Sequence, residues 1–239
     1  MKFRWVASLL AGALIASAQT QSQDTNVSAR VKVLRDGSAA QTQHEENIVV
    51  WLRPVDPQVA TRPAPASNLR LTQHNKSFEP HVLVVPVGAV VEFPNRDPFF
   101  HNVFSLFDGK RFDLGLYEAG GTRNVSFDRP GISYIFCNIH AEMSAVVIAL
   151  DTPYFAVSNR RGEIVIPNVP TGHYILHVWY EGALPSTLKA LTREINVTPD
   201  SSTLGVLQIP AEMTVHAHKN KYGMDYEAPP RSGSGYDHR

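Results

Sequence analysis

Three side chains of types that can bind a metal ion stand three residues apart in one short segment, Cys137-Asn138-Ile139-His140-Ala141-Glu142-Met143. Thiolate, imidazole and thioether groups are together acceptable to both oxidation states of copper. Cys137 is the only cysteine in the 239 residues, and a further imidazole, His101, lies upstream at the start of an apolar run. One cysteine, two histidines and one methionine make a complete ligand set for a mononuclear blue-copper site.

Each of these residues also has an ordinary structural explanation when it is taken alone. A lone cysteine is more often a small buried hydrophobic residue than a ligand, and a methionine beside a strand can be core packing. Their conjunction favours a metal site, because the sole cysteine has a histidine three residues later and a methionine six residues later. We therefore predict His101, Cys137 and His140 as the strong ligands and Met143 as a weak axial ligand. Asn102 is predicted to tie the two ligand segments together through side-chain hydrogen bonds.

The elements that must position these ligands are strands. Short runs rich in Val, Ile, Phe and Tyr alternate with turns of Gly, Pro, Asn and Asp, and long helical periodicity is absent, so we predict an all-β protein. Around the ligands we expect strands at Val82–Val85, Val87–Phe93, His101–Phe107, Asn124–Phe127, Ile132–Phe136 and Ser144–Leu150. One ligand would then open a strand, one would end a strand, and two would follow in the next loop.

The rest of the chain divides into parts of different composition. We expect a signal peptide at 1–18, an N-terminal β segment with a Pro-rich linker at 19–68, the copper-binding domain at 69–150, a second small β-sandwich at 151–210 and a mobile tail at 211–239. The N-terminal β segment is expected to supply edge strands to one of the sandwiches. The tail has few apolar residues and several Pro and Gly, which is typical of a mobile segment.

The N-terminus has the pattern of an export signal. Lys2 and Arg4 precede the apolar stretch 6–15, and Ala16-Ser17-Ala18 has the small-x-small form of a cleavage site. We therefore expect a periplasmic or secreted protein. The stretch is too short to cross a bilayer, and no other segment approaches the roughly 20 apolar residues that a span needs. An oxidising compartment usually pairs cysteines in disulfides, so a lone Cys137 requires another explanation.

The numbers of basic and acidic residues are balanced. The chain has 22 basic and 22 acidic residues, for a formal charge of zero. This balance gives no support to nucleic-acid binding or to attraction by an anionic membrane.

The stretch 78–150 resembles a cupredoxin of the plastocyanin and amicyanin branch. The resemblance is in Pro86-Val87-Gly88, Val90-Val91-Glu92-Phe93, Asn95, Asp97 and His101-Asn102-Val103, then in Phe127-Asp128-Arg129-Pro130-Gly131, Tyr134 and the short Cys-x-x-His-x-x-Met loop. It implies a Greek-key β-sandwich holding one type 1 copper, with a single-electron carrier function between a redox donor and acceptor and no enzymatic activity.

The wider chain resembles bacterial exported proteins labelled methylamine-utilisation or plastocyanin-like. In these, a carboxypeptidase-regulatory-like, transthyretin-type sandwich with an Ig-like fold follows the cupredoxin. That second resemblance is in 162–174 and His177-Val178-Trp179. It identifies a fold and not an activity.

Two other functions stay open at this point. One is an envelope binding or assembly module, in which the C-terminal sandwich engages a carbohydrate or another protein and copper is structural or stored. The other is a thiol enzyme with Cys137 as nucleophile and His140 as base, which is disfavoured because such pairs generally come from distant segments. We expect His81 to be an exposed histidine at the end of a strand, and His216 and His218 to be non-functional. We expect Phe99, Phe100, Ile139 and Ala141 to form an apolar docking patch near His140.

Overall fold

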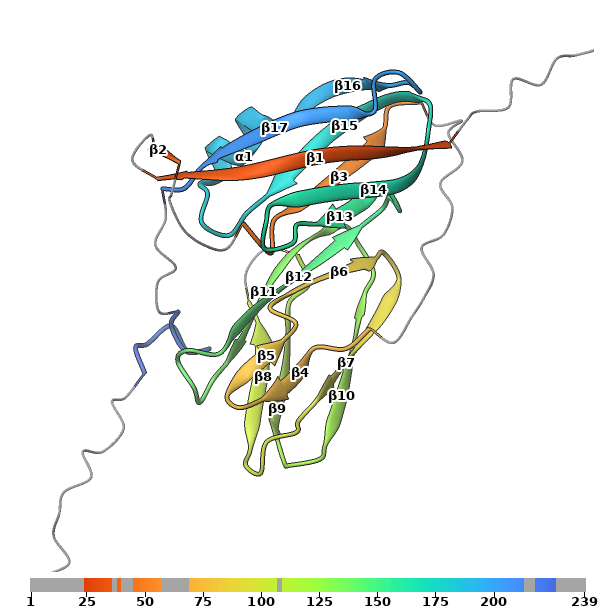
Figure 1. Ribbon diagram of the computed structural model, residues 1–239. Coiled ribbons are helices and arrows are strands. Elements are labelled where there is room, and N and C mark those ends of the chain that lie inside the picture. The colour runs from red at the N-terminus through yellow and green to blue at the C-terminus, as the bar shows by residue number, and fades with distance from the viewer. Residues whose placement is uncertain are drawn as a thin grey trace, which may run out of the picture.

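The computed structural model describes residues 24–35, 38–39, 45–56, 69–106, 109–212 and 218–226. The predicted signal peptide and most of the Pro-rich linker lie outside the described residues. Regular structure in the described part consists of strands and one short helix, α1 (Pro185–Leu191), so the all-β prediction is confirmed. No helix of this part is long and apolar enough to cross a membrane. Two domains are stacked one above the other in Figure 1.

The lower domain is a β-sandwich of two unequal layers. Its strands are β4 (Thr72–His74), β5 (Ser77–Glu79), β6 (Val82–Pro86), β7 (Ala89–Pro94), β8 (His101–Ser105), β9 (Phe112–Tyr117), β10 (Thr122–Phe127), β11 (Gly131–Cys137) and β12 (Ser144–Leu150). One layer has the strand order β6-β12-β11-β8-β9, and the other contains β10-β7 with the β4–β5 hairpin beside β7. Apolar residues that alternate along the strands, such as Val91, Phe93, Val125 and Phe127, fill the space between the layers.

Strand β12 departs from this alternation, because six of its seven residues are buried. Ala145, Val147 and Ala149 face the core of the lower domain. Val146 and Ile148 belong to a separate cluster on the other face. A strand without a polar face must be covered on both sides of its sheet. The upper domain covers the outer face of β12.

The upper domain is a second sandwich. Its strands come from the segments that precede and follow the lower domain in the sequence. Its strands are β1 (Asp24–Arg35), β2 (Ser38–Ala39), β3 (Val49–Pro54), β13 (Phe155–Val157), β14 (Glu163–Pro170), β15 (Gly172–Trp179), β16 (Arg193–Val197) and β17 (Thr203–Pro210). The sheets have the orders β14-β1-β17, with β2 paired to β1, and β13-β3-β15-β16. The chain therefore enters the upper domain, forms the lower domain between β3 and β13, and returns.

The N-terminal strands are central, which corrects the expectation of edge strands. β1 pairs with β14 on one side and, in parallel, with β17 on the other. β3 lies between β13 and β15. Val27, Val31 and Leu52 of these strands are fully buried in the core of the upper domain, so removing this segment would open both sheets.

An apolar cluster joins the two domains. Val82, Val146 and Ile148 of the lower domain pack with Val49 and Trp179 of the upper domain.

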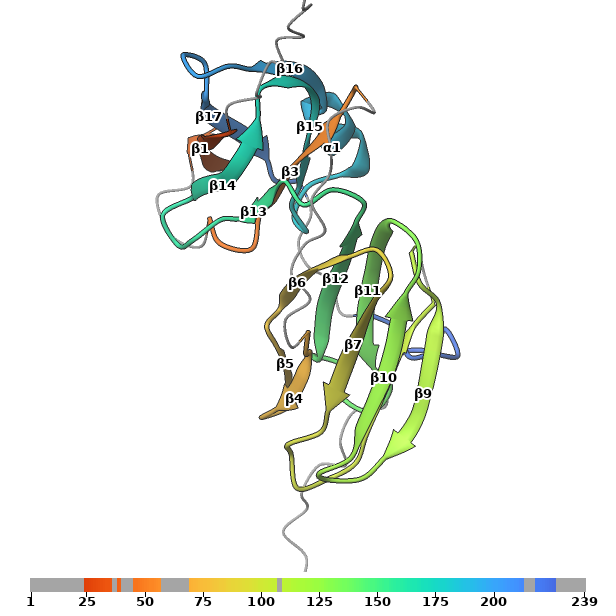
Figure 2. The same ribbon diagram turned by 90° about the vertical axis from the view of Figure 1, so that its right-hand side faces the viewer.

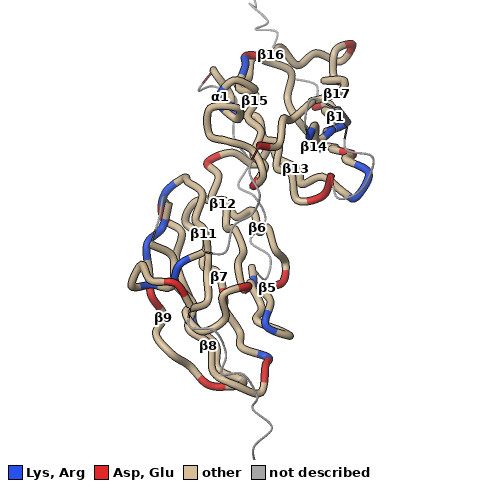
Figure 3. The backbone as a smooth tube through the Cα atoms, turned by 90° about the vertical axis from the view of Figure 1, so that its left-hand side faces the viewer, with Lys and Arg blue, Asp and Glu red and all other residues tan. Residues whose placement is uncertain are grey.

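His81, next to Val82 in the sequence, makes polar contacts at the domain boundary. Its Nε2 lies 2.7 Å from a Glu181 carboxylate oxygen, and its Nδ1 lies 3.2 Å from the Ser144 carbonyl oxygen. Both basic and acidic residues are distributed over each domain in Figure 3. The predicted exposed histidine His81 is thus a half-buried contact between domains.

Candidate metal site

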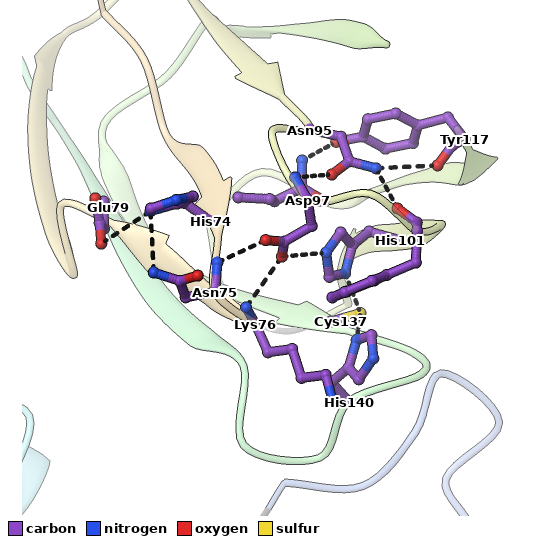
Figure 4. Close-up of polar contacts among 12 residues, drawn as sticks. His74, Asn75, Lys76, Glu79, Asn95, Asp97, His101, Tyr117, Cys137 and His140 are labelled. Carbon is purple, nitrogen blue, oxygen red and sulfur yellow. Dashed lines mark hydrogen bonds and ion pairs between the residues drawn. The ribbon is translucent and has the colours of Figure 1, made fainter. Parts of the chain in front are cut away.

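Three of the predicted ligands meet at one end of the lower domain. The Cys137 sulfur lies 3.6 Å from Nδ1 of His101 and 3.6 Å from Nδ1 of His140. All three donor atoms lie within 4.8 Å of one another. Figure 4 shows both imidazoles pointing toward the sulfur. With metal–nitrogen and metal–sulfur bonds of about 2.0 and 2.3 Å, near-trigonal or tetrahedral coordination places nitrogen and sulfur about 3.6 Å apart.

Strand pairing and loop hydrogen bonds produce this convergence. Cys137 ends β11 opposite Val103 of β8, the strand that His101 opens. The loop then closes on itself: the Cys137 N–H donates to the Met143 carbonyl at 3.1 Å, and the Met143 N–H donates to the His140 carbonyl at 3.2 Å. Both ends of the ligand loop are therefore fixed by backbone bonds.

Met143 is fully buried in the same core cluster as Cys137. Its buried thioether side chain is chemically suited to an axial contact. The axial role of Met143 stays a prediction.

Asn102 ties the ligand segments together through its backbone. Its carbonyl accepts a hydrogen bond from the Asn138 N–H at 3.0 Å. Its side-chain amide instead donates to the Asp113 carboxylate at 2.6 Å and to the Gly115 carbonyl at 2.9 Å, both on β9. The expected side-chain link to the ligand loop is replaced by this link to β9, because β8 pairs with β9 on that side.

A carboxylate that the ligand prediction did not include holds the first histidine. Oδ2 of Asp97 lies 2.8 Å from Nε2 of His101, leaving Nδ1 to face the sulfur. Asp97 itself accepts backbone N–H bonds from Asn75 at 2.6 Å and Lys76 at 3.0 Å. Those two residues have positive φ angles of 52° and 55° and form the turn between β4 and β5. Figure 4 shows this series of hydrogen bonds, from the turn to the Asp97 carboxylate and on to the His101 imidazole.

Asn95 fixes the loop that carries this carboxylate. Its side-chain amide donates to the Phe99 carbonyl at 2.8 Å and the Glu118 carbonyl at 3.1 Å, and its oxygen accepts from the Asp97 N–H at 3.0 Å. Sequence reasoning noted Asn95 and Asp97 only as part of the family resemblance. The signal available was an Asp four residues before His101 in a Pro-bounded turn.

Electrostatics favour the deprotonated thiol. Burial raises the pKa of the Cys137 thiol, but hydrogen bonds from His101 and from three backbone N–H groups outweigh burial and lower the pKa below its ordinary value. Burial lowers the pKa of His101, yet its hydrogen bonds with Cys137 and Asp97 raise the pKa overall. Burial and the neighbouring His101 lower the pKa of His140. A thiolate and a neutral imidazole are the forms that bind metal, so the pKa shifts of Cys137 and His140 favour binding. The raised pKa of His101 means that metal binding there must displace a proton.

Phe99 of the predicted apolar patch lies beside the more accessible imidazole, that of His140. The Phe99 ring lies 5.2 Å from that of His101 and 5.6 Å from that of His140. Phe100 is 52% exposed and Ile139 is 45% exposed, whereas His101 is fully buried and His140 only partly buried. The site therefore approaches solvent at the His140 side.

Part of the predicted mobile tail has a defined place. Residues 218–226 lie against β11 and the ligand loop, where the His218 ring stacks on Phe136 with 4.1 Å between centroids. His216 lies outside the described residues. The sequence pattern did not predict this packing of His218, because His218 and Phe136 are 82 positions apart in the sequence.

No protein-family model matches the chain, and no curated protein matches it by sequence. Similar solved structures include the purple cupredoxin from Nitrosopumilus maritimus, 23% identical over 34% of this chain and 96% of its own, with a TM-score of 0.31. A reduced amicyanin mutant is 19% identical over 39% of this chain and 95% of its own, at 0.33. A copper-containing nitrite reductase from Thermus scotoductus is 23% identical over 49% of this chain and 28% of its own, at 0.33. The two-layer fold of the lower domain is established by its own strand pairing.

Proposed function

We propose that this chain is a type 1 copper protein that carries single electrons between a redox donor and a redox acceptor. The observation that supports it is the meeting of His101 Nδ1, Cys137 Sγ and His140 Nδ1 at one point. Two imidazoles and one thiolate in a trigonal set, with a methionine as weak axial ligand, are typical of electron-transfer copper sites. Met143 is proposed as that axial ligand.

The residues around the site would keep its geometry constant while an electron enters and leaves. Bound copper would supply a one-electron couple. Asp97 holds His101 in one orientation, and the loop hydrogen bonds hold Cys137 and Met143. A coordination cage that changes little between oxidation states needs little reorganisation. The partly buried His140 edge, with the apolar side chains beside it, is the proposed contact with redox partners.

Export and the second sandwich are part of the proposal. The N-terminal pattern supports a periplasmic or secreted location. Metal binding would explain why the lone Cys137 stays unpaired in such an oxidising compartment. The upper domain is proposed as the carboxypeptidase-regulatory-like sandwich of the sequence resemblance. Binding of a carbohydrate or an envelope protein by this domain is the alternative function, and it predicts pull-down or glycan binding that survives Cys137→Ser.

Addition of Cu(II) to the purified chain tests the copper proposal. We expect an intense visible band from thiolate-to-copper charge transfer, lost in Cys137→Ser. The matched control is His177→Gln, which removes an imidazole that lies in the upper domain and stacks on Trp51 of the neighbouring strand β3. A copper-loaded protein without visible colour would contradict the type 1 assignment.

A further inference from the structure

The chain returns to the lower domain after the upper domain is complete. Strand β17 ends at Pro210, and residues 218–226, the C-terminal segment, lie beside the ligand loop. Figures 1 and 2 show this segment in blue next to the lower domain, away from the sheets of the upper domain to which β17 belongs. A segment without helix or strand is held at this place by specific contacts.

Two of those contacts reach consecutive residues of the ligand loop. The Tyr226 hydroxyl donates a hydrogen bond to the carbonyl of Cys137. The Lys221 N–H donates to the side-chain oxygen of Asn138 at 2.9 Å. Cys137 is the proposed thiolate ligand, so the Tyr226 bond is made to a ligand residue itself.

The same segment is also connected to the strand of the first histidine. The Lys221 ammonium lies 2.8 Å from one oxygen of Asp113, and the other oxygen of Asp113 accepts from the Asn102 side chain at 2.6 Å. Asn102 adjoins His101. The hydrogen bond with Asp113 raises the pKa of Lys221, which favours the charged ammonium. The C-terminal segment thereby bonds directly to the ligand loop and to β9, and it is connected to β8 through Asp113 and Asn102.

Burial of apolar side chains does not explain this placement. Two large apolar side chains of the C-terminal segment are mostly in solvent: Tyr222 is 70% exposed and Met224 is 61% exposed. The polar groups face the loop instead, and His218 supports Tyr226 with Nδ1 at 3.2 Å from its hydroxyl. The segment is thus fixed by hydrogen bonds and one ring stack directed at the ligand region.

We propose that the C-terminal segment positions the ligand loop, with Tyr226 as the positioning residue for Cys137. The carbonyl and the sulfur belong to the same residue, so holding the peptide plane restricts the directions in which the thiol can point. Such outer contacts determine how well a metal cage keeps its shape. For the copper-bound protein this inference rests on the proposed function, whereas for the metal-free loop it does not.

A comparison of Tyr226→Phe with Tyr222→Phe tests the inference. Both changes remove one hydroxyl from the same segment, but only the first removes a bond to the loop. In metal-free protein we expect the buried Cys137 thiol to react with a disulfide reagent about 2- to 10-fold faster in Tyr226→Phe, because one hydrogen bond is worth about 0.5–1.5 kcal/mol. Tyr222→Phe should react at the rate of the unmodified chain. Far-UV circular dichroism confirms that both variants are folded.

Copper loading gives a second readout that general stability would not change. We expect a displaced charge-transfer band and reduction potential in Tyr226→Phe and unchanged values in Tyr222→Phe. Equal thiol reaction rates in Tyr226→Phe and the unmodified chain would overturn the inference. If neither the unmodified chain nor the variants form a coloured copper protein, the proposed function fails. The positioning role still stands in that case if the thiol of Tyr226→Phe reacts faster than that of the unmodified chain.

Discussion

At the scale of single residues, the least expected feature is that Asp97 controls the orientation of His101. Asp97→Asn keeps the size of the side chain but replaces a charge-assisted bond to Nε2 with a weaker one. We expect copper affinity to fall by about 10- to 100-fold, as is typical when the outer partner of a ligating histidine is lost. Competition with a copper chelator measures the change.

The control for this residue is Asp128→Asn. Asp128 is an exposed carboxylate that pairs with Lys110 at 3.1 Å and lies just before β11, at the end of that strand opposite Cys137. Its loss should leave copper affinity unchanged. If both variants bind copper as the unmodified chain does, the Asp97–His101 bond has no part in holding the metal.

At the scale of elements, β12 begins directly after the ligand loop and is covered on both faces. Ile148 faces the interdomain cluster and is 1% exposed. Ile148→Ala should lower the free energy of unfolding by about 2–5 kcal/mol through lost burial and a residual cavity. Urea denaturation measures this loss.

Val90→Ala provides the comparison, because Val90 lies on β7 with 54% of its surface exposed. A change within about 0.5 kcal/mol is expected there. An equally small effect of Ile148→Ala would show that the outer face of β12 is not held against the upper domain in solution.

At the scale of the whole molecule, the ion pair between His81 and Glu181 makes domain contact depend on pH. The hydrogen bond and charge of Glu181 raise the pKa of His81 above 6.5 against the effect of burial. Because the folded pKa is raised, the stabilisation is complete below pH 6.5 and is lost as the pH rises through the folded value. The side chains are 36% and 21% exposed, so solvent screening limits the pair to about 0.2–1 kcal/mol.

Thermal unfolding of Glu181→Gln checks this at two pH values. The loss of stability relative to the unmodified chain should be larger at about pH 5.5 than at about pH 8.5. In a His81→Gln background the same substitution should have no pH-dependent effect. A loss that is equal at both pH values would contradict the assigned ion pair.

The local pattern of the sequence predicted the all-β class and the Cys137, His140 and Met143 spacing, because strand periodicity and a seven-residue loop are short-range features. It also indicated His101, since a strand-opening histidine is visible in the sequence. Only the tertiary structure decided that Asp97 is anchored by a distant turn, that β1 is a central strand, and that Tyr226 reaches Cys137. These depend on segments tens to more than a hundred residues apart meeting in space, and pairing over such distances is set by packing and hydrogen bonding that no local pattern encodes.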